Sequence, residues 1–358
     1  MKECTTRLLI ALAAATVLLV AGLCWAQSGG QAQNPPQKKA VEQQKQEEPQ
    51  EPYTEEEYDA YDKAVKEPDI AKRAAALIAF MEKYPKSKLQ EYIVAAYKTL
   101  LFEYSKAGDY AKVESAAEQW LKFAPNDLQT IAAIAESAQK LEHHQKFIEH
   151  GSRIYAQKPT AQLAFAIYQA YAKLLDEAKK TEWALKLLEY PEFNDNFDLR
   201  MQFVAKYAEK DLPKAAEYAQ QALKALDIAK KPDVTPAADW NKAVTLVRYQ
   251  CNNIIGMNLI GQKKWAEAIP VLEKALQAEC YDAGYYWIGM CWWNLGGMDN
   301  FELAYYSFAK AELLKGPLEA QANKRCVDLY KQTHNDNTTG IDKVYKKAKS
   351  DMNCGRSK

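Results

Sequence analysis

The chain has 358 residues, of which 48% are hydrophobic and 26% are charged, and its 47 Lys and Arg residues equal its 47 Asp and Glu residues in number. This length can hold two or three ordinary domains, or one elongated array of small units. The balanced charge gives no electrostatic argument for binding nucleic acid or anionic lipid headgroups, so we expect no nucleic-acid partner.

Residues 1–26 have the layout of a secretory signal peptide. Lys2 and Arg7 precede an apolar run, and Cys24 and Ala26 stand three residues and one residue before a cut ahead of Gln27. We therefore expect cleavage near Ala26 and a periplasmic or secreted protein. The alternative is an uncleaved N-terminal anchor with the body facing the periplasm, because the apolar run is only a little shorter than a span of about 20 residues.

Residues 27–52 are rich in Gln, Pro and Glu and carry almost nothing to bury, which predicts a disordered linker. From Tyr53 onward Leu, Ala, Glu and Lys dominate, and apolar residues recur at spacings of three and four. This pattern predicts helices throughout the rest of the chain.

Proline ends several of the predicted helical stretches. FMEKYP ends at Pro85, WLKFAP at Pro125, IYAQKP at Pro159 and LKLLEYP at Pro191, and the last two intervals are 34 and 32 residues long. Proline cannot continue a helix and restricts the residue before it. The spacing therefore predicts a repeated unit of a helix, a tight turn and an antiparallel helix.

The clearest copy of this unit is residues 249–280. It contains a large–small pair, a further large residue and a second-helix signature, at Ile255, Gly256, Leu259, Trp265, Ala268, Leu272 and Ala275. This copy resembles the tetratricopeptide repeat family. The next copy resembles it too, with a three-residue insertion in its turn, at Ile288, Gly289, Trp292, Phe301, Ala304, Phe308 and Ala311.

The resemblance implies an all-α fold, a right-handed α-solenoid of antiparallel helix pairs in which small residues let two helices approach and large ones fill the groove between them. We expect a degenerate array at 53–231, in which Ala117 and Trp120 exchange bulk, and regular repeats at 240–317. Two prolines in 226–240 separate these arrays. Capping helices are expected at 318–350.

The stretch YYWIGMCWWNLGG, which begins at Tyr285, then divides its aromatic residues between two faces. On the family's pattern Tyr285 and Trp292 belong to the core. Other residues on this helix and its equivalents line the concave groove in which such proteins bind peptides. The expected partner-binding residues are Tyr286, Met290, Trp293, Asn253, Met257, Lys98 and Phe102, with Ile260 and Ser105 at equivalent positions. The alternative is that the chain's own C-terminal helix covers Tyr286 and Trp293.

We expect no catalytic, cofactor-binding or metal-binding residue. His143, His144 and His150 form the only histidine cluster, and their spacing on a helix does not suit one metal ion, which predicts a solvated or turn-facing cluster. Five cysteines remain after cleavage, and they show no disulfide framework. Cys291 and Cys326 are expected on neighbouring helices, where buried thiols are preferred over a disulfide.

These features favour a non-enzymatic protein–protein interaction scaffold of the bacterial cell envelope, which binds a partner segment in its groove. A membrane-tethered assembly factor is the alternative, since FMEKYPKSK and WLKFAPND resemble repeats of outer-membrane assembly proteins. An enzyme with a site assembled across repeats ranks third. The partner and the oligomeric state stay open.

Overall fold

The computed structural model describes residues 53–352, and every regular element in that range is a helix. The predicted signal peptide and linker therefore lie outside the described residues. The chain divides into two compact units between Tyr190 and Pro191. The predicted all-α fold is confirmed for the described residues.

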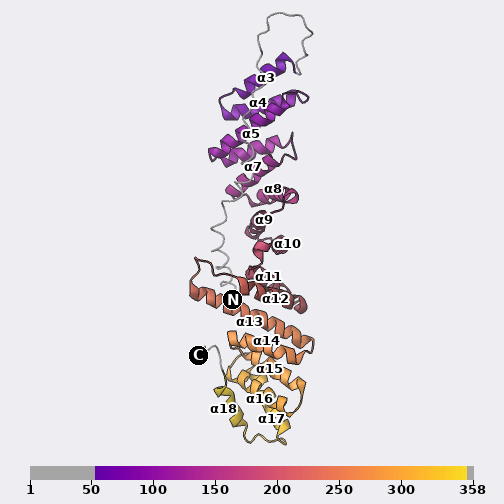
Figure 1. Ribbon diagram of the computed structural model, residues 1–358, viewed down its shortest axis with the longest axis vertical. Helices are drawn as coiled ribbons and strands as arrows, with labels where there is room; N and C mark the ends of the chain where they lie inside the picture. Colours follow the sequence, from indigo (N-terminus) through magenta and orange to yellow (C-terminus); the bar gives the residue numbers. More distant parts are fainter. Residues whose placement is uncertain (1–52, 353–358) are drawn as a thin grey trace, which may run out of the picture. The chain divides into compact units, whose positions relative to one another are not determined.

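The first unit contains four pairs of helices, shown from indigo to magenta in Figure 1. They are α3 (Glu55–Val65), α4 (Ile70–Lys83), α5 (Gln90–Lys106), α6 (Tyr110–Trp120), α7 (Leu128–Lys140), α8 (His144–Gln157), α9 (Ala161–Lys173) and α10 (Glu177–Leu187).

The second unit begins with a short 3₁₀ helix and continues with three further pairs of helices and two C-terminal helices. They are η1 (Pro191–Phe193), α11 (Phe197–Tyr207), α12 (Leu212–Ile228), α13 (Ala237–Gly261), α14 (Trp265–Ala278), α15 (Asp282–Leu295), α16 (Met298–Leu313), α17 (Glu319–Thr333) and α18 (Ile341–Ser350).

Within each unit, each helix up to α17 packs against the next one along the chain, whereas α18 packs against α16. Short turns join these packed helices, which agrees with the helix pairs that the resemblance implied. The expected helices at the C-terminal end are present as α17 and α18. The right-handed sense of the array stays a prediction.

The turn inside four of the pairs has one recurring geometry. A single residue adopts the left-handed backbone conformation, and the amide of the next residue donates to the carbonyl oxygen five positions earlier. This bond satisfies a helix end that would otherwise lack a partner. The donors are the amides of Asp109, His143, Asp176 and Lys264, at N–O distances of 3.0, 2.8, 3.1 and 2.9 Å. The left-handed residues are Gly108, Glu142, Leu175 and Lys263.

Helix starts differ between the early and the late part of the chain. From α3 to α12, most helices have a side chain at the N-cap that accepts an amide hydrogen bond, which stabilises the first turn. These caps are Thr54, Asp69, Asp109, Asp127, Thr160, Asp176, Asn196 and Asp211. None of the helices from α13 to α18 has such a cap.

Glycines let the helices of the α13–α14 and α15–α16 pairs approach closely. A Cβ atom added at Gly256 would lie 2.5 Å from Cδ2 of Leu272, and one at Gly289 would lie 2.8 Å from Cδ1 of Phe308. Both distances are too short for a carbon contact. The small-against-large complementarity that the resemblance implied is therefore confirmed in these two pairs.

The α5–α6 pair solves the same packing problem with a different arrangement. The ring of Tyr97 stacks on Trp120 at 4.5 Å between centroids, and the Tyr97 hydroxyl donates to the carbonyl oxygen of Ala116 at 2.9 Å. Trp120 and Ala117 are fully buried, so the predicted exchange of bulk holds.

The segment 226–240, which was expected to separate the degenerate from the regular array, lies inside the second unit. α12 and α13 on either side of that segment share one apolar core. This core contains Ala219 and Leu226 of α12 and Val247 and Cys251 of α13. The two prolines interrupt the helices without separating the packing. The bounds of the two arrays stay a prediction.

Candidate binding site

The α15 helix presents two side-chain stripes. At about 100° per residue, Tyr286, Met290 and Trp293 share one face, and Tyr285, Ile288 and Trp292 share another about 130° away. The first stripe is the predicted groove. In the second stripe, Tyr285 and Trp292 were predicted to be core residues. Ile288 was predicted to be the large residue of the Ile288–Gly289 pair.

The first stripe packs against the chain's own helices. Tyr286, Met290 and Trp293 are half-buried against the apolar cluster of α16, α17 and α18. The Tyr286 ring lies 5.5 Å from that of Phe308, and the Arg325 guanidinium lies 4.5 Å from the Trp293 ring centre. These contacts support the alternative interpretation, in which the chain's own C-terminal part covers the stripe. Binding of a partner on this stripe stays a prediction.

The equivalent residues elsewhere have separate surroundings. In α13, Asn253 accepts a hydrogen bond from the Tyr281 hydroxyl at 2.9 Å, and Met257 is half-buried. In the first unit, Lys98 pairs with Asp127 at 3.3 Å, while Phe102 is an exposed apolar residue. The structure brings Tyr286, Met290 and Trp293 onto one surface. Lys98 and Phe102 belong to the first compact unit, whereas the other predicted partner-binding residues belong to the second.

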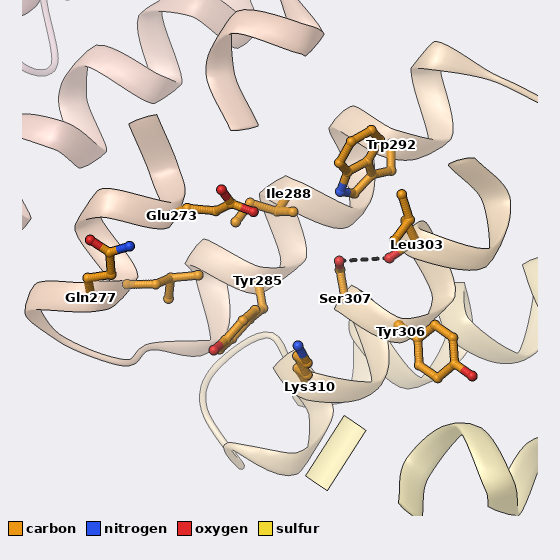
Figure 2. A pocket seen from close by; sticks show the side chains of 10 residues that line it. Glu273, Gln277, Tyr285, Ile288, Trp292, Leu303, Tyr306, Ser307 and Lys310 are labelled. Carbon is orange, nitrogen blue, oxygen red and sulfur yellow. Dashed lines mark hydrogen bonds between the residues drawn. The ribbon is translucent and has the colours of Figure 1, made fainter. Parts of the chain in front are cut away.

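The second stripe forms the floor of a pocket between three consecutive helices (Figure 2). The cavity volume is about 330 Å³. Tyr285 and Trp292 pack against the apolar core of α14 and α15, as predicted. They are only half-buried, and both also line this pocket. The lining residues are Glu273, Leu276 and Gln277 of α14, Tyr285, Ile288 and Trp292 of α15, and Leu303, Tyr306, Ser307 and Lys310 of α16.

The pocket is lined by a mixture of apolar and polar side chains, with one charged residue on each of its two outer helices. Glu273 projects from α14 and Lys310 from α16, and the Lys310 ammonium lies 5.6 Å from the Tyr285 ring centre. Burial, with a further contribution from Glu273, raises the pKa of the Tyr285 hydroxyl, which therefore stays protonated. The Ser307 hydroxyl donates to the Leu303 carbonyl oxygen at 2.8 Å. This arrangement suits binding of an apolar side chain.

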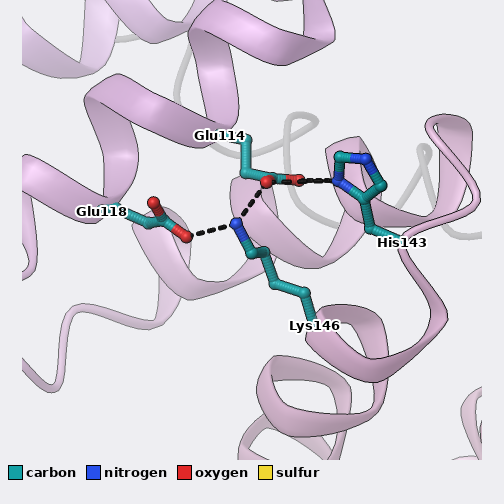
Figure 3. Close-up of polar contacts among 4 residues, drawn as sticks. All are labelled: Glu114, Glu118, His143 and Lys146. Carbon is teal, nitrogen blue, oxygen red and sulfur yellow. Dashed lines mark hydrogen bonds and ion pairs between the residues drawn. The ribbon is translucent and has the colours of Figure 1, made fainter.

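A polar cluster in the first unit joins α6 to the start of α8 (Figure 3). The carboxylate of Glu114 is nearly buried, and Nδ1 of His143 lies 3.0 Å from it. Lys146 pairs with the same carboxylate and with Glu118. Burial alone would raise the pKa of Glu114, but the hydrogen bonds from Lys146 and His143 outweigh it and lower that pKa. The cluster is a fully paired crosslink between helices, in which only the Glu114 carboxylate is buried.

The histidines only partly match the predicted solvated or turn-facing cluster. His143 is exposed at the N-cap of α8, as expected for a turn. His150 is buried beside Phe147 and Gly151, which makes the prediction wrong for this residue. Burial lowers the pKa of His150, and its Nδ1 atom has no hydrogen-bond partner. Within residues 53–352, no group of three or more His, Cys, Asp or Glu side chains could hold a metal ion.

The cysteines of the helical cores are buried thiols. Cys291 and Cys326 are both free and fully buried, in agreement with the preferred alternative. Burial raises the pKa of each to about 12, so they hold almost no thiolate at neutral pH. They act as small apolar residues of the core.

Sequence reasoning missed the pocket, although one signal was available. The α16 residues that face Tyr285 and Trp292 include Ser307 and Lys310, which do not fill the pocket as a large apolar residue would.

Membrane-spanning helices were also searched for in residues 53–352. No helix there combines the length and the hydrophobicity that a transmembrane span requires.

No family model matches the chain, and no curated protein matches it. Among solved structures, the chain is similar to a tetratricopeptide repeat protein from Parabacteroides merdae ATCC 43184, with 15% sequence identity and a TM-score of 0.28. The match covers 77% of this chain and 96% of the other.

Proposed function

We propose that the chain is a non-enzymatic protein-binding scaffold that is exported to the bacterial cell envelope. Stacked helix pairs with glycine-dependent packing form a stable framework, and such frameworks bind other proteins through surface grooves. The observation that carries the proposal is the open pocket between α14, α15 and α16, which is lined by both apolar and polar side chains and has a charged residue on each of its two outer helices.

The pocket favours a polypeptide ligand with one large apolar side chain. Ile288, Trp292 and Leu303 supply apolar contacts, and a volume of about 330 Å³ accommodates one such side chain. Glu273 and Lys310 lie on different helices, so they suit a ligand segment with a basic residue on one side and an acidic residue on the other. We place the binding surface at this pocket, with the Tyr286–Met290–Trp293 stripe as the second candidate.

Site-specific photocrosslinking tests this placement. Leu303 at the pocket and Leu185 in the first unit have similar exposed fractions, 43% and 40%, so p-benzoylphenylalanine at Leu185 is a matched control. We expect a discrete crosslinked protein from position 303 in intact cells, absent from position 185. Its loss in a Lys310→Glu background would show that the pocket edge contributes. Identical crosslinks from both positions would contradict the placement.

The stripe has its own test. Trp293→Ala removes the ring under Arg325, so the melting temperature and the crosslinking at position 303 are both measured. A lower melting temperature with crosslinking retained per folded molecule assigns Trp293 to structure. Loss of crosslinking at unchanged stability assigns it to the binding surface.

Export is tested separately from binding. The N-terminal layout described above supports it, and we expect the mature protein to begin at Gln27 and to be released with the periplasmic fraction. N-terminal sequencing and cell fractionation check this. A chain that begins at Met1 and pellets with membranes after a high-salt wash would instead favour the tethered assembly factor.

A further inference from the structure

Helix α18 carries a local positive charge, although the charge of the whole chain is balanced. Four of its ten residues are lysines, and all four are exposed. They are Lys343, Lys346, Lys347 and Lys349. Asp342 is the one acidic residue of the helix, so four positive charges less one negative charge leave a net charge of +3.

The four lysines share the outer face of α18. At about 100° per residue they fall within an arc of about 160° around the helix. The buried residues Val344 and Ala348 lie on the opposite side, where α18 packs against α16. Figure 1 shows α18 at the edge of the second unit. The lysines therefore form one continuous outward surface, which we call the lysine face.

Contacts with α16 hold α18 in place. Val344 and Ala348 expose only 4% and 0% of their surface, and the Tyr345 hydroxyl donates to Oε2 of Glu312 at 2.5 Å. The Lys347 ammonium lies 4.3 Å from the centre of the Tyr306 ring. Because the helix is already formed and anchored, binding through the lysine face requires no ordering of the backbone.

The stability of the helix does not account for the lysine face. Lys347 and Lys349 lie in the last turn, where a positive charge interacts favourably with the helix dipole. Lys343 lies in the first turn, where the same interaction is unfavourable. None of the ion pairs between described residues involves any of the four lysines. Their charges are therefore available to a ligand.

We propose that the lysine face binds the surface of an anionic phospholipid bilayer. A lysine ammonium is a compact point charge that needs no fixed partner geometry, and each one near such a bilayer raises the affinity about fivefold. α18 contains no arginine, the residue suited to bidentate recognition of a single carboxylate or phosphate.

The chemistry of the face favours a bilayer over an acidic peptide. Peptide-binding surfaces concentrate their affinity in large apolar or aromatic anchors. None of the exposed large apolar residues in the described part of the chain lies on α18. The face thus offers charge without an anchor, which suits a broad anionic surface. Such attachment would keep the protein at a membrane even after its N-terminal segment is removed.

Vesicle co-sedimentation with the full chain tests the proposal. Sucrose-loaded vesicles contain either equal parts of phosphatidylglycerol and phosphatidylcholine, or phosphatidylcholine alone. We expect stronger binding to the anionic vesicles, and this excess should fall as NaCl rises from about 50 to about 500 mM, because salt screens the charges. Binding to neutral vesicles measures what the apolar N-terminal segment contributes. Equal binding to both kinds of vesicle would overturn the proposal.

Two charge-matched variants assign the binding to α18. Replacing Lys343, Lys346 and Lys349 with glutamine should lower the affinity for anionic vesicles on the order of 100-fold, at about fivefold for each lysine. Lys347 is kept, because it contacts Tyr306. The control removes the same charge from exposed lysines of the first unit, by Lys106→Gln, Lys122→Gln and Lys140→Gln.

The control variant should bind the anionic vesicles like the wild type. The melting temperatures of both variants should match that of the wild type, because all the substituted residues are exposed. An equal loss of binding in the two variants, or no loss in the α18 variant, would contradict a site on the lysine face.

Acetylation mapping locates the contact without any substitution. Sulfo-N-hydroxysuccinimide acetate labels exposed lysines, and mass spectrometry compares the free protein with the protein on anionic vesicles. We expect protection of Lys343, Lys346 and Lys349, with unchanged labelling of Lys106 and Lys122. Protection of the first-unit lysines alone would place the contact elsewhere and overturn the proposal.

A labelled decaglutamate peptide is the competing probe. Binding of this peptide to the wild type but not to the α18 variant, without a preference for anionic vesicles, would identify an acidic polypeptide as the ligand and rule out the bilayer. These assays need no protein partner, so their result does not depend on the proposed binding pocket.

Discussion

The α5–α6 pair and the α13–α14 pair distribute side-chain bulk in opposite ways. In α13–α14, Gly256 on the first helix accepts Leu272 from the second. In α5–α6, the corresponding positions are held by Leu101 and Ala117, both buried, so the large residue is on the first helix. The comparison teaches that the interface requires one small and one large residue, and that either helix can supply the large one.

The early and late parts of the chain also differ in how their helices begin. The N-caps that recur from α3 to α12 are absent from α13 to α18, where glycine-dependent contact brings the helices close together. Local capping and close packing both stabilise short helices. The sequence signature of the repeat family consists of the small and large residues that make these close contacts. Only the late copies rely on such glycine contacts, which explains why only they resemble the family clearly.

The largest expected effect is removal of Trp120, a residue of α6 in the first unit that is the largest fully buried side chain in the described part of the chain. Trp120→Ala should destabilise that unit by about 3–5 kcal/mol, because the indole is fully buried and stacks on Tyr97. Urea unfolding followed by hydrogen exchange in α5 and α6 measures it. Phe308→Ala is the matched change in the second unit and should cost a similar amount there. A loss below about 1 kcal/mol for Trp120→Ala would break the comparison, since a bulky residue would then be dispensable.

A double-mutant cycle sharpens the comparison at smaller energies. Gly256→Ala should cost about 1–3 kcal/mol, because its Cβ would overlap Leu272. Leu272→Ala removes the overlapping atoms, so the double variant should lose less than the sum of the two single losses, by about 1 kcal/mol. The free energy of unfolding of the four proteins measures this coupling. Strict additivity would show that the two residues do not share an interface.

The smallest expected effect is pH dependence confined to the first unit. The pKa of His150 is lowered, so its contribution to stability is complete above its ordinary value of about 6.5 and is lost as the pH falls below it. The pKa of Glu114 is also lowered, so its contribution is lost only as the pH falls below about 4.5. Both effects make the first unit less stable in acid.

Hydrogen exchange in α6 and α8 at pH 7.5 and 5.5, corrected for intrinsic exchange, measures the part that belongs to His150. The charged groups that act on the pKa of His150 are Glu149, Arg153, Glu118 and Lys146. His150→Leu should flatten the dependence in this range, whereas His144→Gln should leave it unchanged. A steep dependence that survives His150→Leu assigns the effect to another group.

Helix positions could be predicted well from the sequence, because proline stops and apolar spacing act locally. Capping helices were expected within 318–350, and α17 and α18 occupy Glu319–Thr333 and Ile341–Ser350. Burial could not be predicted equally well. Tyr285 and Trp292 have the pattern of core residues, but their exposure depends on Ser307 and Lys310 of the next helix.

The unit boundary and His150 show the same limit from two sides. Prolines in 226–240 interrupt the chain locally, yet the residues before and after them share one core. His150 was read by its chemistry as a surface residue, whereas its spacing of three from the buried Phe147 places it on the inner face of α8. In both cases the tertiary neighbours decide, and a single sequence does not display them.

The recurring turn offers positions at which substitutions can raise the thermal stability of the protein. Of its four left-handed positions, only Gly108 has the residue type that adopts this backbone without steric penalty, while Glu142, Leu175 and Lys263 tolerate it. Leu175 also exposes 80% of its surface to solvent, so its apolar side chain contributes little burial of apolar surface. Glycine or asparagine at these three sites would make a more heat-resistant variant without altering any helix, which would give crystallographers and protein designers a sturdier starting material.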